Sequence, residues 1–202
     1  MKTAGTANAL YADSYDAYAM PYKLSSTANA YVLGGEDMKA KWWIQFLSEL
    51  GIVYSNIAGM ARTKYLCPDI PWDDQANDPK AWGANVNIYS LATDAGVNWA
   101  NHPKTTKIRM SSQGCMLIES CNYDSSVKMP VSPAKYDNAW SFTGQGNWGT
   151  GFDYIRHQGT GNILFWDGHA ESRRRAEIPG ITSGAGGAAR KKIPFYGGGY
   201  TP

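Results

Sequence analysis

The chain has few charged residues and contains no long hydrophobic run. Only 18% of its 202 residues are charged, and the formal net charge is +2. We therefore expect no bulk electrostatic attraction to nucleic acid or to an acidic partner. No segment approaches the ~20 consecutive apolar residues of a transmembrane helix, and no signal-peptide pattern opens the sequence. The residues present thus predict no nucleic-acid partner and no membrane-spanning segment.

Cysteine is also scarce, and its spacing excludes thiolate metal sites. The three cysteines are Cys67, Cys115 and Cys121, with no Cys-x-x-Cys pair among them. If residues 115–119 form a strand, Cys115 and Cys121 lie roughly 20 Å apart, which is too far for a disulfide. A disulfide would then join Cys67 to Cys115 or to Cys121. The alternative is three buried, reduced thiols that pack as small hydrophobes.

Recognisable catalytic motifs are missing as well. The three histidines are His102, His157 and His169, and the sequence contains no G-x-S-x-G nucleophile motif. No paired acid and base and no metal-ligand set accompanies them. We therefore predict a non-enzymatic protein without a cofactor.

Aromatic residues and turn formers are abundant instead. The chain holds 8 Trp, 13 Tyr, 22 Gly and 10 Pro, a composition typical of a loop-rich domain with short strands. Its length suits one domain, which we place at residues 1–180. A Gly-rich tail follows at 181–202, and we expect it to be mobile or ordered only by docking on a neighbour.

The residue patterns predict an α+β fold. Residues 4–19 carry a tyrosine stripe at helical spacing, and Pro21 should stop that helix. A second helix is expected from an Asp37 N-cap to Gly51. Strands are then predicted at the following ranges: 84–89, 106–110, 115–119, 162–166 and 169–173. A helix followed by successive antiparallel strands favours a helix packed on a sheet.

The last two strands flank the most informative motif, in which His157 is followed by nine residues and then Asp167-Gly168. Asp-Gly between apolar flanks predicts a type I′ hairpin turn. That turn would pair Trp166 with His169, and it would place Ile163 and Phe165 on the core side and Leu164 and Trp166 on a half-exposed face. We expect the Asp167 carboxylate to serve the turn backbone, and Arg156 or His157 to tie the loop to a neighbouring backbone or carboxylate group.

This spacing resembles the prepilin-type processing-associated H-X9-DG family, whose members resemble type IV pilins and type II secretion pseudopilins. The residues that carry the resemblance are Arg156, His157, Asp167, Gly168 and His169. Four other landmarks follow the order of the family: the helix end at 9–18, Leu66-Cys67-Pro68, Trp82-Gly83-Ala84-Asn85 and Leu117-Ile118-Glu119-Ser120. The similarity covers roughly residues 4–180.

The resemblance implies a pilin-like fold with an N-terminal helix packed on an antiparallel sheet, long loops and a C-terminal Asp-Gly hairpin. Residues 4–19 would be the remnant of a long helix, and the apolar part of that helix is absent here. This apolar part would make the only contact with a membrane. The implied role is that of a structural, pilin-like or pseudopilin-like subunit in a bacterial cell envelope, on its periplasmic face or outside the cell. Its partners would be other pilin-like subunits or secretion-system components.

Two loop features leave alternatives open. Four carboxylates in one loop are candidates for binding calcium, although they lack the EF-hand pattern and also suit a solvated acidic loop: Asp69, Asp73, Asp74 and Asp78. Tryptophans outside the predicted helices suggest a second function, an extracellular carbohydrate- or polymer-binding module with glycan partners. The candidate surface for it comprises Trp72, Trp148 and Trp166.

Overall fold

The structure is a computed structural model, and it describes the following residues: 2–20, 32–33, 36–37, 82–85, 103–124, 129–130, 141–142, 150–154, 157–180 and 192–200. The helical elements of this part are α1 (Lys2–Ser14), α6 (Pro194–Gly197) and the 3-10 helices η3 (Thr105–Lys107) and η5 (Arg175–Glu177). The strands are β1 (Val32–Leu33), β2 (Glu36–Asp37), β3 (Trp82–Asn85), β4 (Cys115–Asp124), β5 (Met129–Pro130), β6 (Ser141–Phe142), β7 (Thr150–Phe152), β8 (Thr160–Phe165) and β9 (Ala170–Arg174).

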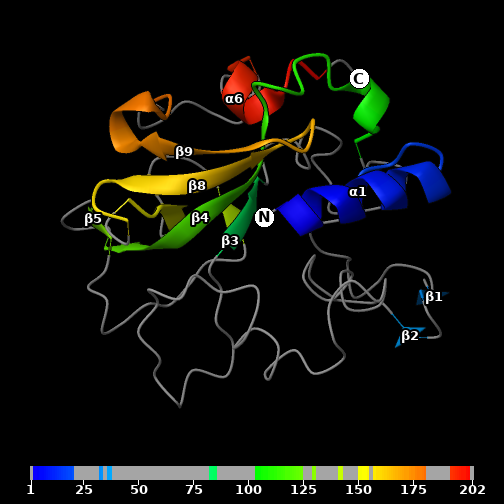
Figure 1. Cartoon of the computed structure of the whole chain (residues 1–202), viewed down its shortest axis with the longest axis horizontal. Helices are drawn as coiled ribbons and strands as arrows, with labels where there is room; N and C mark the ends of the chain where they lie inside the picture. Colours follow the sequence, from blue (N-terminus) through cyan, green and yellow to red (C-terminus); the bar gives the residue numbers. More distant parts are fainter. Residues whose placement is uncertain are drawn as a thin grey trace.

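One main sheet organises the described residues. Its central order is β6-β3-β4-β8-β9, and β5 and β7 also pair with the long strand β4. All its pairs are antiparallel except the short β3–β6 pair. Figure 1 shows α1 beside one end of these strands and α6 next to the sheet. The α+β class is therefore confirmed.

Most predicted strands form close to the expected places, and one does not. β3, β4, β8 and β9 overlap the predictions at 84–89, 115–119, 162–166 and 169–173. The strand predicted at 106–110 is wrong, because these residues form part of η3 and a following turn. The backbone N–H of Thr105 donates to Ala17 O at 2.8 Å, so this segment is held against the end of α1 as a turn.

Helix α1 is shorter at its end than the sequence predicts. It stops at Ser14, and Asp16 and Ala17 then adopt positive φ angles of 49° and 62°. The Ala17 N–H donates to Ala12 O at 2.8 Å, which closes a Schellman-type helix end before Pro21 is reached. The predicted tyrosine stripe is partly confirmed, since Tyr11 is fully buried and stacks on Tyr15 with ring centroids 4.4 Å apart.

The buried core extends past the predicted domain boundary at residue 180. Phe195 and Tyr196 of α6 belong to the same buried cluster as Phe152, Ile163 and Phe165. The expectation of a mobile or neighbour-docked tail is therefore wrong for residues 192–200. Sequence reasoning weighed the glycines of this segment and overlooked its Pro-Phe-Tyr turn, whose aromatic rings are buried among those of the sheet.

The remaining expectations concern the N-terminal third. Asp37, the predicted N-cap, lies in β2 and pairs with Val32 of β1, whereas the predicted helix itself lies outside the described residues. In the part of the chain that is described, no helix has both the length and the apolar character needed to cross a membrane.

Candidate functional site

The Asp-Gly hairpin closes in a different register from the predicted one. Leu164 pairs with Ala170, and the Phe165 N–H donates to His169 O at 2.9 Å. The turn therefore has a three-residue loop, in which Gly168 has a φ of 87° and donates its N–H to Phe165 O at 3.0 Å. This is a type I turn followed by a glycine bulge, so the predicted two-residue I′ turn and the Trp166–His169 pair are wrong.

The tight turn with two left-handed residues lies instead at the other end of β8. His157 and Thr160 form an antiparallel bridge around Gln158 and Gly159, whose φ angles are 54° and 98°. Both values fit a type I′ turn. The Thr160 hydroxyl and N–H both bond to His157 O, at 2.9 and 3.2 Å. This turn fixes the position from which the His157 side chain projects.

The His157 ring reaches a buried carboxylate, which is one of the alternatives that the sequence left open for the tether. Its Nε2 lies 3.1 Å from Oε1 of Glu119, whose side chain is only 2% exposed. Glu119 also accepts hydrogen bonds from the Asn162 backbone N–H at 2.7 Å and from Asn162 Nδ2 at 3.1 Å. Because burying a carboxylate without partners is strongly unfavourable, these contacts make Glu119 the anchor of the motif.

The sequence did not predict the roles of Glu119 and Asn162 as hydrogen-bonding partners in this motif. Glu119 was singled out as the acidic end of a strand, but its contact with His157 was not foreseen. The available signal was a glutamate directly after the apolar run 115–118, which places a charge where the strand is buried. Arg156, the other predicted tether, lies outside the described residues.

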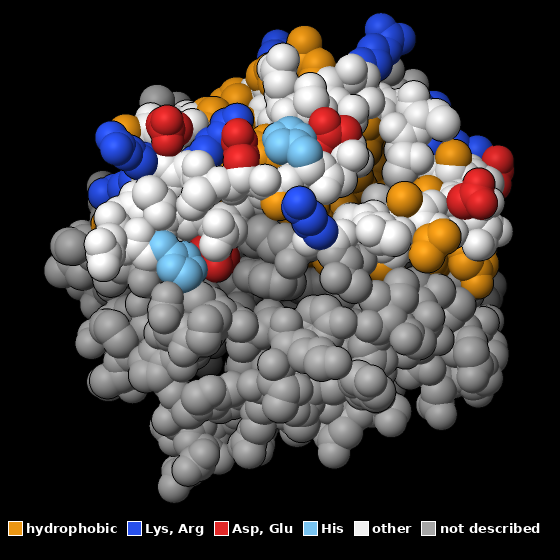
Figure 2. Space-filling view, in the orientation of Figure 1, with side chains coloured by type: hydrophobic (Ala, Val, Ile, Leu, Met, Phe, Trp, Pro, Cys, Tyr) orange, Lys and Arg blue, Asp and Glu red, His pale blue; other side chains and the backbone are white. Residues whose placement is uncertain are grey.

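The hairpin tip joins Asp167 to His169. Asp167 Oδ1 accepts the His169 N–H at 3.1 Å, which confirms that the carboxylate serves the turn, and it also lies 2.5 Å from His169 Nδ1. Burial raises the pKa of Asp167, but the hydrogen bonds from His169 outweigh this effect and hold the pKa below its ordinary value. Figure 2 shows histidine side chains next to acidic ones on this face of the molecule.

The ring of His169 packs on Phe165. The two rings are nearly parallel, with centroids 4.3 Å apart, and the Arg173 guanidinium lies 5.0 Å from the Phe165 centroid on the same strand pair. Phe165 is fully buried, as is Leu164, which the sequence placed on a half-exposed face. Both faces of β8 are therefore covered, and the predicted division into one core face and one half-exposed face is wrong.

His157 and Asp167 do not meet. They lie at opposite ends of the six-residue strand β8, a separation of about 20 Å at ~3.3 Å per residue. Each histidine instead has its own carboxylate, Glu119 or Asp167. Within the described segments no group of three or more potential metal ligands occurs. The geometry is that of two separate structural contacts at the ends of one strand.

Two other predicted residues can be placed: Trp166 differs from the expectation for it, whereas Cys115 agrees with the alternative of a buried, reduced thiol. Trp166 is only 9% exposed and packs near Gly114, so it is not an exposed binding residue of the predicted surface. Cys115 is a free, fully buried thiol, and burial raises its pKa. The proposed Cys67–Cys115 disulfide is therefore wrong. The other candidates lie outside the described residues: Asp69, Asp73, Asp74, Asp78, Cys67, Trp72, Trp148 and the side chain of Cys121.

The hairpin tip lies against helix α1 at Gly5. A Cβ added to Gly5 would lie 3.2 Å from Leu164 Cδ1 and 3.3 Å from Gly168 Cα. Glycine at this point lets the helix backbone lie directly against the hairpin tip.

The chain matches no family of known proteins, no curated protein sequence and no solved structure.

Proposed function

We propose that this chain is the globular part of a non-enzymatic, pilin-like or pseudopilin-like subunit of a bacterial cell envelope. The observation that carries the proposal is the way both ends of the H-X9-DG segment are built into the scaffold. His157 contacts the buried Glu119 at one end, and Gly168 lies against Gly5 of α1 at the other. Such a segment couples the N-terminal helix to the sheet, as a structural subunit requires.

The chemistry of the segment supports the same reading. Its histidines contact separate carboxylates about one strand length apart, and its apolar residues are buried in the sheet. A catalytic pair would need both groups at one accessible point. In the proposed subunit, α1 continues an apolar helix that packs among equivalent helices, while the sheet and its loops face other subunits or secretion-system components.

The outer face of α1 offers a direct test of assembly. Leu10 is a large apolar side chain that is 54% exposed on the helix, whereas Met110 is 42% exposed on the turn after η3. We propose thiol cross-linking of the Leu10→Cys variant in the bacterium that carries the gene, with Met110→Cys as the matched control. The parent chain gives the background from its own cysteines.

Membership in a helix-packed assembly predicts a ladder of cross-linked species for Leu10→Cys and little above background for Met110→Cys. It also predicts recovery of the chain in the envelope or the sheared surface fraction. Recovery in the cytoplasm, with no cross-link above the parent chain, would overturn the proposal.

A further inference from the structure

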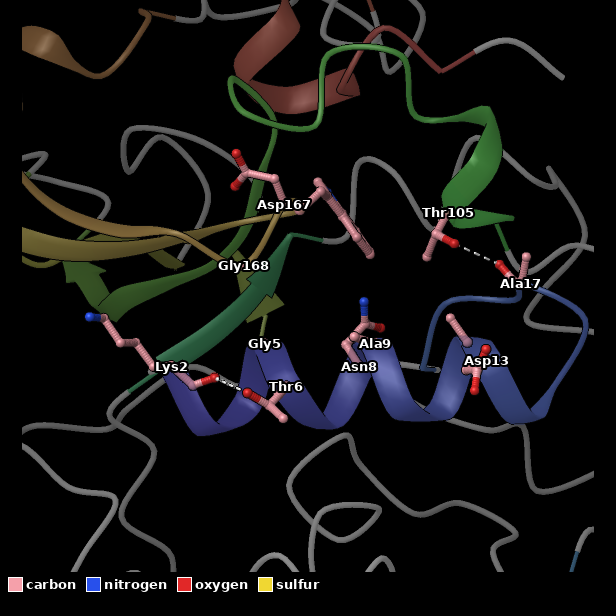
Figure 3. A pocket seen from close by; sticks show the side chains of 12 residues that line it. Lys2, Gly5, Thr6, Asn8, Ala9, Asp13, Ala17, Thr105, Asp167 and Gly168 are labelled. Carbon is pink, nitrogen blue, oxygen red and sulfur yellow. Dashed lines mark hydrogen bonds between the residues drawn. The ribbon is translucent and has the colours of Figure 1, made fainter.

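Strand β9 is the outermost strand of the main sheet, and its outer edge has no neighbouring strand among the described residues. It pairs with β8 alone, and Figure 1 shows it along one border of the sheet. Both ends of the strand are fixed. The hairpin tip lies against α1, where Figure 3 shows Gly168 next to Gly5, and η5 follows directly after Arg174. An edge that is already ordered loses little conformational entropy when another strand pairs with it.

The hydrogen bonds of the hairpin show which backbone groups of β9 face outwards. The Phe165 N–H donates to His169 O, so the odd-numbered residues of β9 bond to β8 and the even-numbered residues face away from it. The Arg174 N–H agrees with this alternation, because it donates to Glu177 Oε2 at 2.6 Å. Ser172 is exposed, and its N–H and C=O groups are therefore available to a further strand.

The side chains of β9 follow an order that is complementary to itself. If two copies of β9 pair antiparallel about Ser172, Glu171 of each copy faces Arg173 of the other. The remaining facing residues are Ala170 and Arg174, whose charges do not oppose each other. Glu171 and Arg173 share one face of the strand, since Arg173 Nε lies 2.5 Å from Glu171 Oε1 within the chain. Opposite charges that face each other across an antiparallel pair stabilise it.

The neighbouring registers lack this match. Pairing centred one residue away brings Glu171 opposite Glu171 or Arg173 opposite Arg173, and like charges directly opposite each other destabilise a strand pair. Charged residues on edge strands often prevent pairing. A set of charges of one sign would repel a second copy in each of these registers, whereas the charges of β9 attract it in the register centred on Ser172.

We propose that the outer edge of β9 binds the same edge of a second copy of this chain, by antiparallel pairing centred on Ser172. The two main sheets then continue as one sheet across the contact. A five-residue strand makes a small contact, so the association is reversible and weak. The Glu171 and Arg173 side chains are 40% and 29% exposed, so salt weakens the pairing. This inference goes beyond the proposed envelope role and does not depend on it, because it rests on the sheet edge.

Sedimentation equilibrium of the whole chain, from micromolar to millimolar concentration, measures this association. We expect a reversible equilibrium between monomer and dimer that added salt weakens. Glu171→Arg and Arg173→Glu each place like charges opposite each other, and each should weaken association at least tenfold. An equimolar mixture of the two variants should dimerise about as strongly as the parent chain, because every arginine of one variant then faces a glutamate of the other.

Two further variants test the backbone contact and the net charge. Ser172→Pro removes an N–H that faces outwards and no hydrogen bond to β8, so it should abolish association. Asp13→Arg makes the same change in net charge as Glu171→Arg at an exposed position of α1, and it should leave association unchanged. Thermal unfolding shows whether each variant retains the fold. Should Arg173→Glu unfold because it loses the guanidinium contact with Phe165, the other two edge variants decide.

Several outcomes would overturn the proposal. The parent chain stays monomeric at millimolar concentration, Glu171→Arg or Ser172→Pro dimerises as strongly as the parent, or the mixture of the two folded charge variants stays monomeric. A dimer that Asp13→Arg disrupts would assign the contact to α1 and would equally overturn it.

Discussion

At the scale of single residues, Glu119 is the side chain on which the histidine end of the motif depends. Its two oxygens accept three hydrogen bonds from His157 and Asn162 while the side chain is almost completely buried. The negative charge and the acceptor geometry are both needed, because each of the three facing groups is able to donate.

We predict that Glu119→Gln destabilises the chain by about 2 kcal/mol, since its new amide group cannot accept a hydrogen bond where the carboxylate oxygen did. The free energy of unfolding in urea measures this change. Glu171→Gln is the matched control, because the Glu171 side chain is 40% exposed, and it should change stability by less than about 0.5 kcal/mol. Equal effects of the two substitutions would contradict the anchoring role of Glu119.

The hairpin tip predicts a pH dependence. The folded state lowers the pKa of Asp167 below its reference value of 3.8. Stability from the ionised carboxylate is therefore present above pH 4 and is lost as the pH falls through the folded-state pKa. Asp167→Asn should be less stable than the parent at pH 6 and equally stable near pH 2, as measured by thermal unfolding. A difference that persists unchanged at low pH would contradict this assignment.

At the scale of elements, the hairpin shows how turn chemistry can mislead. Asp-Gly indicated the correct turn, but a three-residue loop and a two-residue loop both place glycine at a positive φ. The choice moved the register by one residue, so that His169 stacks on Phe165 instead of facing Trp166. With the three-residue loop, the hairpin tip packs against Gly5 of α1, and the local sequence gives no sign of this contact.

Two glycines at the start of β8, Gly159 just before the strand and Gly161 within it, are needed for different reasons. Gly159 has a φ of 98° with nothing within 4 Å of an added Cβ, whereas a Cβ on Gly161 would lie 2.5 Å from Phe152 and 2.6 Å from Asp153 O. We predict a loss of about 1–2 kcal/mol for Gly159→Ala through backbone strain. Gly161→Ala should lose about 3 kcal/mol through overpacking.

Denaturant unfolding of both variants tests this distinction. Phe152→Leu removes the ring atoms that the new methyl group would meet. It should partly restore the stability of the Gly161→Ala variant and should not restore that of Gly159→Ala. If it restores neither variant, overpacking against Phe152 is not the cause.

At the scale of the whole molecule, the C-terminal segment completes the core. The Asn85 amide donates to Cys115 O at 2.8 Å and to Tyr196 O at 3.0 Å, so one buried side chain joins β3, β4 and α6. Tyr196 also donates its hydroxyl hydrogen to Pro179 O at 2.6 Å. The contact between Asn85 and Tyr196 joins residues that lie 111 positions apart in the sequence.

We predict that truncation after residue 191 abolishes cooperative unfolding, because it removes Phe195 and Tyr196 from the buried cluster. Near-UV circular dichroism and a thermal scan measure the loss. Truncation after residue 200 is the matched control and should leave both signals unchanged. A cooperative transition in the shorter chain would show that the sheet is stable without α6.

The local sequence is sufficient to predict the α+β class, the first helix, the strands β3, β4, β8 and β9, the turn at Asp167-Gly168 and a tether formed by Arg156 or His157, of which the structure describes His157. These features depend on local patterns: alternation of apolar residues, helical spacing and the conformational freedom of glycine. It misplaced the end of α1, the strand at 106–110, the hairpin register and the boundary at residue 180.

Apart from the end of α1, which a local hydrogen bond between Ala17 and Ala12 closes, these points depend on partners far away in the sequence. Glu119 supplies the carboxylate for His157, Ala17 holds the segment of η3 as a turn, and Gly5 receives the hairpin tip. Likewise, Phe195 and Tyr196 are buried only because the sheet offers them an apolar surface. Local patterns encode which element forms, whereas burial and long-range hydrogen bonds fix its register, its ends and the partner it meets.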